Sequence, residues 1–463
     1  MNQPGSASRL YSNALATALS VLLSGSALAQ WDVPDALEAA VDGLDEDQAA
    51  FITSGDVLDF IPERQLEHEL STRDPESLGR FVDDLMAVAA DMAYDPERDM
   101  GAAPLNLESS SFHNRNVTTP APLRDFERTP GPFSVHRYLF PQSGVPTFGG
   151  AKVAVWPEDL VAGKVDVAIA GVPNNASSGR RDAGNGPNAM RALDTIAAPD
   201  VRSLIKPFDV LSVVDYGDFG GDYMSTERSI GHIADMVAET AGTGAVPMLV
   251  GGDTSMLYPG VQGVARVHGN QSFGLLHFSA HPDAYRHGDH TINDRQAVFR
   301  LIDQEIVGGD DTIEVGLRGP DVDVDTLQWL RDQGVRYHTM AEIQRRGFDD
   351  VLRRVLREVE RGPDAFFVSI DVSAIDPGDM VAAGRATAHG LRPDQVTEAI
   401  RAVCASKQIV GFEITDLAPM LDVSLRSVTN ANAILNACLI GIALNKQGLD
   451  PDYYHPLALD HGQ

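Results

Sequence analysis

The chain has 463 residues, of which 43% are hydrophobic and 22% charged, a composition typical of a globular protein and unlike that of a disordered or collagenous chain. Its 66 acidic residues outnumber its 36 Lys and Arg residues, giving a formal net charge of -30. Such a surface repels phosphate backbones, so we expect no nucleic-acid partner. A cationic small molecule, a basic partner or a purely solubilising role is compatible with the charge.

The first 29 residues predict an export signal peptide. Arg9 and the amino terminus form a positive region, and residues 14–23 (ALATALSVLL) form an apolar core. Ala27 and Ala29 then fit the small-x-small cleavage rule, with Gln30 as the new terminus. The apolar run is shorter than the roughly 20 residues that span a bilayer. We therefore expect an exported protein, periplasmic or secreted, with no membrane span after cleavage.

An acidic helical region is expected at residues 30–100, followed by a linker at 101–135 that is rich in Pro, Ser, Thr and Asn. Residues 30–129 contain 23 acidic residues, 7 arginines and no lysine, and 7 − 23 = −16 is about half of the net charge. Apolar residues at helical spacing predict helices over 34–50 and 75–94. The expected apolar face of the second helix consists of Phe81, Leu85, Val88 and Met92.

From residue 136 to 450 short apolar runs alternate with helical patterns, which predicts one α/β domain before a tail at 451–463. Continuously apolar strands are buried on both faces. The expected fold class is therefore a three-layer α/β/α arrangement with a mostly parallel sheet of about eight strands. The expected strands are residues 165–173, 210–219, 245–253, 272–283, 312–319, 335–339, 364–371 and 409–419. Ligands bind beyond the carboxyl ends of such strands.

Only two cysteines, Cys404 and Cys438, occur in the chain, both in segments with a helical pattern. No CxxC motif is present, so thiolate zinc sites and redox motifs are not expected. The two thiols could pair in an oxidising compartment, but the sequence does not place their Cα atoms. Two buried free thiols are the expectation that we favour.

Four of the expected strand ends carry polar motifs in a fixed order. They are residues 251–255 (GGDTS), 277–283 (HFSAHPD), 369–377 (SIDVSAIDP) and 411–419 (GFEITDLAP). With SGVPTF at 143–148 and DYGD at 215–218, they resemble the ureohydrolase family of arginases and agmatinases, and agmatinases in particular. The resemblance covers about residues 140 to 445 and leaves the acidic region outside.

The resemblance implies hydrolysis of the C–N bond of a guanidino compound or related linear amidine at two manganese ions that share a bridging hydroxide. Of the six side chains that hold the ions in the family, three are matched here by His281, Asp283 and Asp371. The other three positions carry hydroxyls, Thr254, Ser279 and Ser373. Hydroxyls are poor manganese ligands compared with carboxylates.

Two carboxylates and one imidazole can balance one divalent ion but not two. We therefore expect at most one divalent metal ion, manganese or similar, or none. On the substrate side, the resemblance places Asp416 where the family has a Glu that contacts the guanidinium, and it places His290 near the substrate. Residues 386–391 depart from the family's loop. His277, on a buried strand, is expected to be a core residue.

Three functions remain open on the sequence. The favoured one is a non-catalytic homologue that binds a small cationic guanidino or amine ligand, or serves as partner subunit to an intact family member. The second is a C–N hydrolase with one metal ion or a reorganised site. The third is a binding module that acts through the acidic N-terminal region. The resemblance also implies a trimer or hexamer, which would be a homo-oligomer or a hetero-oligomer.

Overall fold

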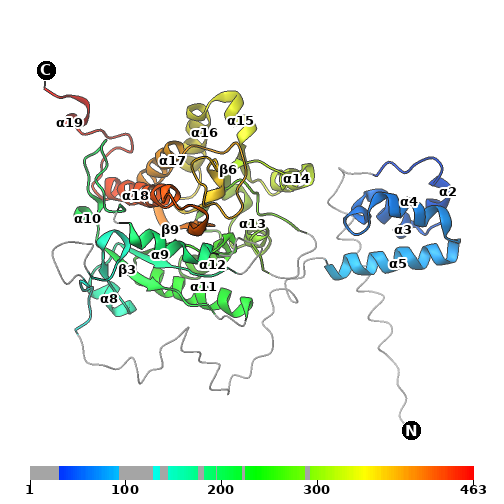
Figure 1. Ribbon diagram of the computed structural model, residues 1–463, viewed down its shortest axis with the longest axis horizontal. Coiled ribbons are helices and arrows are strands. Elements are labelled where there is room, and N and C mark those ends of the chain that lie inside the picture. Colours follow the sequence, from blue (N-terminus) through cyan, green and yellow to red (C-terminus); the bar gives the residue numbers. More distant parts are fainter. Residues whose placement is uncertain are drawn as a thin grey trace, which may run out of the picture. The chain divides into compact units, whose positions relative to one another are not determined.

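The computed structural model describes residues 31–92, 129–135, 144–175, 182–193, 195–221, 225–286 and 292–462. They fall into two compact units, one containing residues 31–92 and the other almost all of the remaining described residues (Figure 1). The predicted signal peptide and His290 lie outside the described residues, as does most of the predicted linker.

The first unit is a small helical domain with its own apolar core. Its helices are α2 (Glu38–Val41), α3 (Glu46–Ser54), η1 (Asp56–Asp59), α4 (Glu63–Thr72) and α5 (Pro75–Met92). The core consists of Trp31, Leu37, Val41, Ile52, Val57, Ile61, Leu66, Leu70, Leu78 and Val82. A helical N-terminal region is thus present, although its helices differ from the predicted ones in two respects.

The predicted continuous helix over 34–50 is wrong, because a new helix starts at Glu46. The Asp45 side chain accepts a hydrogen bond from the Gln48 N–H at 2.9 Å, and the Gln48 side chain accepts one from the Asp45 N–H at 3.2 Å. This capping box satisfies free N–H groups at a helix start. Phe81 and Leu85 pack on the core as predicted, but the apolar face of α5 also includes the buried Leu78 and Val82, whereas Val88 is 45% exposed.

The second unit is built on a nine-stranded sheet with the order β1-β3-β2-β4-β9-β8-β5-β6-β7, and all the pairings are parallel. The strands are β1 (Lys152–Val153), β2 (Val167–Gly171), β3 (Val213–Asp218), β4 (Val246–Val250), β5 (Gly274–Phe278), β6 (Thr312–Leu317), β7 (Arg336–Thr339), β8 (Ala365–Asp371) and β9 (Gln408–Thr415). All eight predicted strands are present. The two-residue edge strand β1 is the ninth, and it is too short to give a sequence pattern.

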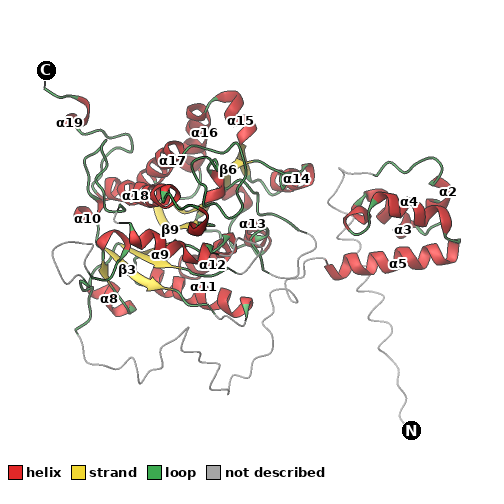
Figure 2. Cartoon of the chain, in the orientation of Figure 1, coloured by secondary structure: helices red, strands yellow, loops and turns green. Residues whose placement is uncertain are grey.

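Helices cover both faces of this sheet, so the predicted three-layer α/β/α fold is confirmed (Figure 2). One face packs on α9 (Gly186–Ala192), α10 (Pro207–Val210), α15 (Met340–Arg346), α16 (Phe348–Arg361), α17 (Pro393–Ser406) and α18 (Arg426–Lys446). The other packs on α8 (Pro157–Ala162), α11 (Thr226–Gly242), α12 (Leu257–His268) and α13 (Ala297–Asp303). Two more helices are α14 (Val324–Asp332) and α19 (Pro456–Leu459).

Helix α18 is the one helix in the described parts of the chain that is long and apolar enough to cross a membrane by length and composition alone. The expectation that no such segment follows the signal peptide is wrong in this respect. The helix is a core helix, however, since 78% of its most apolar window is buried. The Asn432 amide also donates to the Leu193 carbonyl at 3.0 Å and to the Thr195 hydroxyl at 2.9 Å, which fixes α18 to the segment after α9.

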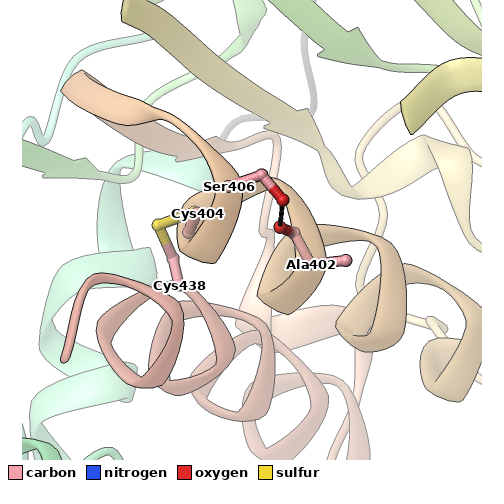
Figure 3. Close-up of a disulfide and its surroundings, with 4 residues drawn as sticks. All are labelled: Ala402, Cys404, Ser406 and Cys438. Atoms are coloured by element: carbon pink, nitrogen blue, oxygen red, sulfur yellow. Dashed lines mark hydrogen bonds between the residues drawn. A yellow bond between two sulfur atoms is a disulfide. The ribbon is translucent and has the colours of Figure 1, made fainter. Parts of the chain in front are cut away.

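The two cysteines form a disulfide between α17 and α18, as Figure 3 shows. The preference for two free thiols is therefore wrong. The two helices pack side by side and bring the Cα atoms to 5.3 Å, within the range that a disulfide needs. In the last turn of α17, the Ser406 hydroxyl donates to the Ala402 carbonyl at 2.7 Å.

We predict that the double change Cys404→Ala and Cys438→Ala destabilises the protein by about 3–4 kcal/mol, since the bond closes a loop of 34 residues in the unfolded chain. Urea unfolding of both proteins measures the difference. A reductant should lower the midpoint of the parent toward that of the variant and leave the variant unchanged. A parent midpoint that does not respond to reductant would contradict the prediction.

Candidate functional site

The four motif-bearing strand ends lie next to one another in the sheet. They belong to β4, β9, β8 and β5, which are consecutive in the strand order, and all four strands run in the same direction. Their carboxyl ends therefore meet at one edge. The resulting cluster contains all of the predicted site residues that the structure describes.

Asp371 lies at the centre of the cluster and accepts hydrogen bonds from all three of the predicted substituted positions. The Thr254 hydroxyl donates to its Oδ2 at 2.8 Å, the Ser279 hydroxyl to the same oxygen at 3.4 Å, and the Ser373 N–H to Oδ1 at 2.7 Å. Asp371 is fully buried. The three residues with hydroxyl side chains thus hold one carboxylate in place without adding charge.

His281 lies beside this group, near two hydroxyl groups and one carboxylate. Its Nδ1 is 3.4 Å from the Ser373 hydroxyl, and its Nε2 is 3.2 Å from the Thr387 hydroxyl and 3.9 Å from Asp321. Burial lowers the pKa of His281, and the nearby positive charge of Arg385 lowers it further. The imidazole is therefore favoured in its neutral form.

A positively charged side chain lies among the carboxylates. The Arg385 guanidinium contacts both oxygens of Asp283, with Nη1 at 2.9 Å from Oδ1 and Nη2 at 3.2 Å from Oδ2. Its Nη2 also donates to Asp371 at 2.9 Å, and its Nε is 3.4 Å from Asp294. All three nitrogens of the guanidinium thus face a buried carboxylate.

The ion-pair cluster favours the charged forms of Arg385 and Asp371. Burial disfavours the charged guanidinium, but Asp283, Asp371 and Asp294 outweigh it and hold the pKa of Arg385 well above its usual value. Burial likewise raises the pKa of Asp371, yet Arg385 and the other donors bring it down to about 2. Arg385 and Asp371 are therefore both charged at neutral pH.

Paired manganese ions, which the resemblance implies, do not fit this arrangement. The guanidinium nitrogens fill the space between Asp283 and Asp371, the two carboxylates that match the family's ligands. A divalent ion would lie directly against a fixed positive charge. Within the described residues, no group of three or more His, Cys, Asp or Glu side chains is arranged to hold a metal ion.

Arg385 is held in place by its own loop, residues 376–391, which we call the Arg385 loop. The Arg385 N–H donates to Asp416 Oδ2 at 2.7 Å, and the Gly384 N–H donates to the Asp416 carbonyl at 2.9 Å. Only glycine fits at 384, because a Cβ there would collide with the Asp416 carboxylate. The two ends of the loop meet where the Gly390 N–H donates to Asp376 at 3.1 Å.

Asp416, predicted to contact a substrate guanidinium, contacts the backbone of the Arg385 loop. It is fully buried, its Oδ1 has no hydrogen-bond partner, and burial followed by the Asp371 charge raises its pKa well above the usual value. Asp416 and Asp283 also adopt positive φ angles, +65° and +45°, which are unfavourable for residues other than glycine. Such strain is concentrated at functional sites.

On the sheet face that packs on α12, a row of buried polar side chains crosses four adjacent strands. The row consists of Glu314 on β6, His277 on β5, Ser369 on β8 and Glu413 on β9. His277 Nδ1 is 2.9 Å from the Ser369 hydroxyl, which donates to Glu413 at 2.6 Å. His277 Nε2 is 3.4 Å from Asp283. Burial disfavours the charged imidazole, but Glu314 and Asp283 raise the pKa of His277 to about 9. The expectation of a buried core histidine is confirmed, and that histidine supports Asp283.

A pocket of about 80 Å³ opens beside the cluster. It is lined by His281, Asp283, Tyr285, Arg295, Asp321 and Arg385, among others. The Arg295 guanidinium stacks on the Tyr285 ring at 4.4 Å and lies 3.7 Å from Asp321. The Arg385 side chain remains 13% exposed, so the pocket reaches the cluster.

The sequence motifs do not assign Arg385 or Asp294 to the site. Arg385 immediately precedes residues 386–391, the loop that departs from the family pattern. An arginine beside a loop that has changed together with three ligand positions is the signal that could have found it. The sequence gives no similar signal for Asp294, since this residue follows a segment without a strand pattern.

The chain belongs to the arginase family, which is matched over residues 165–441. It is 29% identical over 274 residues to the mitochondrial agmatinase of Gallus gallus, covering 58% of this chain and 78% of that protein. A hypothetical agmatinase from Burkholderia thailandensis shares the fold, with a TM-score of 0.60, 23% identity and coverage of 70% and 99% of the two chains. So does the formiminoglutamase of Trypanosoma cruzi with Mn²⁺, with a TM-score of 0.54, 18% identity and coverage of 60% and 94%. The predicted ureohydrolase resemblance is confirmed.

We predict that Arg385→Met destabilises the protein by about 3–5 kcal/mol, because it leaves buried carboxylates unpaired. Adding Asp371→Asn should recover part of this loss, because one fewer buried charge then needs a partner. Chemical denaturation of the two single variants and the double variant gives the coupling energy.

The matched control is the exposed ion pair of Arg266 and Asp235. Its coupling energy should be at most about 1 kcal/mol. Strictly additive effects of Arg385→Met and Asp371→Asn would show that the two side chains do not depend on each other.

Proposed function

We propose that this protein is an exported, non-hydrolytic member of the arginase family whose metal-binding function has been replaced by an internal ion-pair cluster. The observation that supports this most strongly is the contact of the Arg385 guanidinium with both Asp283 and Asp371. A nucleophilic hydroxide at a two-metal site requires two divalent ions close together. The fixed guanidinium charge opposes their entry.

The substituted positions support the same conclusion. Thr254, Ser279 and Ser373 replace ligand positions of the family pattern with neutral hydroxyl groups. Each of them donates to Asp371, so their present role is to stabilise that carboxylate. One imidazole and two carboxylates already engaged by an arginine are a weak ligand set for even a single manganese ion.

Of the two non-catalytic roles, a partner subunit fits better than an amine-binding protein. A free guanidino or amine ligand would be attracted by unpaired carboxylates, but Arg385 already neutralises part of the charge of Asp283, Asp371 and Asp294. The pocket beside them is small, about 80 Å³. We infer that the fold is retained for assembly with copies of itself or with an intact family member.

Export is supported by the sequence of residues 1–29 and by the disulfide between Cys404 and Cys438. Structural disulfides persist in oxidising compartments and are rare in the cytosol. We propose a periplasmic or secreted location.

The decisive experiment measures metal content and activity together. The parent protein, stripped with a chelator and then incubated with manganese, should retain much less than one ion per chain and release no urea from guanidino compounds. Addition of manganese should not change its melting temperature. One ion per chain with measurable hydrolysis would favour the one-metal hydrolase, and two ions per chain would refute the proposal.

We predict that a rebuilt metal site binds manganese more strongly when Arg385 is also removed. The changes Thr254→His, Ser279→Asp and Ser373→Asp, combined with Arg385→Ala, should make stability depend on manganese, with a gain of about 2.7 kcal/mol at a hundredfold excess over Kd. The three changes without Arg385→Ala should respond less, because the guanidinium competes with the ions. Equal responses in the parent and the fourfold variant would show that the site has been assigned wrongly.

We also predict that the mature protein begins at Gln30. Mass spectrometry of protein isolated from its native cells should find this residue, cyclised or not, at the amino terminus. Soluble protein that retains Met1 in the cytoplasm would contradict export.

A further inference from the structure

We propose that the carboxylates of Asp283, Asp371 and Asp294 form a guanidinium-binding site that Arg385 permanently occupies in cis. The inference rests on the proposed function and names the class of cation that the site now holds. That class is a planar, singly charged guanidinium rather than a divalent metal ion.

The geometry of the carboxylate contacts favours a guanidinium. Asp283 contacts two guanidinium nitrogens with its two oxygens, at 2.9 and 3.2 Å. Asp371 contacts Nη2 at 2.9 Å, and Asp294 lies 3.4 Å from Nε. Both Nη nitrogens therefore donate to carboxylates, and Nε lies near a third carboxylate without a hydrogen bond. Paired, fork-like contacts of this kind match the planar donor geometry of a guanidinium, which a spherical ion lacks.

The carboxylates of Asp371 and Asp283 are positioned independently of Arg385. Asp371 is held by Thr254 at 2.8 Å and by the Ser373 N–H at 2.7 Å. The carbonyl of Asp283 accepts the N–H of Val298 at 3.0 Å, at the start of α13, and its carboxylate lies 3.4 Å from His277. The acceptors would therefore remain in place if the arginine side chain were removed.

The Arg385 loop is fixed rather than hinged. The Arg318 guanidinium donates to the carbonyls of Ser373 and Ala388, at 2.7 and 2.9 Å, and so joins the loop to the end of β8. Asp416 holds the backbone at Arg385 itself. A loop anchored at both ends and in the middle keeps its side chain in the site, so Arg385 acts as a resident ligand.

The experiment is chemical rescue. Arg385→Ala leaves buried carboxylates and a cavity of guanidinium shape, so its melting temperature should fall by about 5 °C or more. Millimolar guanidinium chloride should restore part of this loss in a saturable manner. It should have no such effect on the parent or on Arg266→Ala, which removes an exposed arginine.

Three probes test the selectivity of the site. Urea has the same planar shape without the charge, sodium chloride supplies the ionic strength, and manganese chloride supplies the alternative cation. None of them should match guanidinium in Arg385→Ala. Rescue by sodium chloride or urea to the same extent, or stronger stabilisation by manganese, would overturn the inference.

A second variant and a second readout test the inference in the case where Arg385→Ala folds poorly. Arg385→Lys keeps a charge in the site, so it should melt between the parent and the alanine variant and gain nothing from guanidinium. The refolding yield of Arg385→Ala, with and without guanidinium, is then the readout, and an unchanged yield would refute the inference. Manganese uptake by the parent would instead refute the proposed function, so the two failures are distinguishable.

Discussion

The carboxyl edge of the sheet depends on the neutralisation of buried negative charge. Asp283, Asp371 and Asp294 all lie within 3.4 Å of the Arg385 guanidinium and are almost completely buried, a situation that is costly without a cation. Arg385 supplies that cation from within the chain. Its position explains features that otherwise look unrelated: the strained backbone of Asp416, the glycine at 384 and the anchoring of the loop by Arg318.

The three hydroxyl residues are best understood together with this arginine. A site for two divalent ions must supply enough carboxylates to offset four positive charges, whereas a guanidinium carries only one. Ser279 and Ser373 stand where the family pattern has aspartates, which lowers the negative charge toward what Arg385 can balance. Hydroxyl groups also donate hydrogen bonds, so they stabilise Asp371 where additional carboxylates would repel it.

Sequence patterns predicted the parts of this protein that depend on local order. Continuous apolar runs located eight strands, and the motifs at four of their ends predicted a common edge, which the parallel order β4-β9-β8-β5 provides. What could not be predicted depends on distances across the fold. The direction of the Arg385 side chain is set by a loop whose ends are joined through Asp376 and Gly390, and the pairing of Cys404 with Cys438 is set by helix packing. The break between α2 and α3 was predictable, since Asp45 and Gln48 have the spacing of a capping box, but the apolar periodicity concealed it.

If the chain is exported as proposed, helix α18 has a further consequence for its biogenesis. A 21-residue segment this apolar resembles a stop-transfer sequence, and a translocating channel can release such a segment sideways into the lipid. Asn432 and Asn436 counteract this, because burying amides in hydrocarbon is unfavourable. The same two side chains later bind the backbone around Leu193 and Ala198. The two asparagines thus dock α18 in the folded core, and during the proposed export the same amides would oppose its release into lipid.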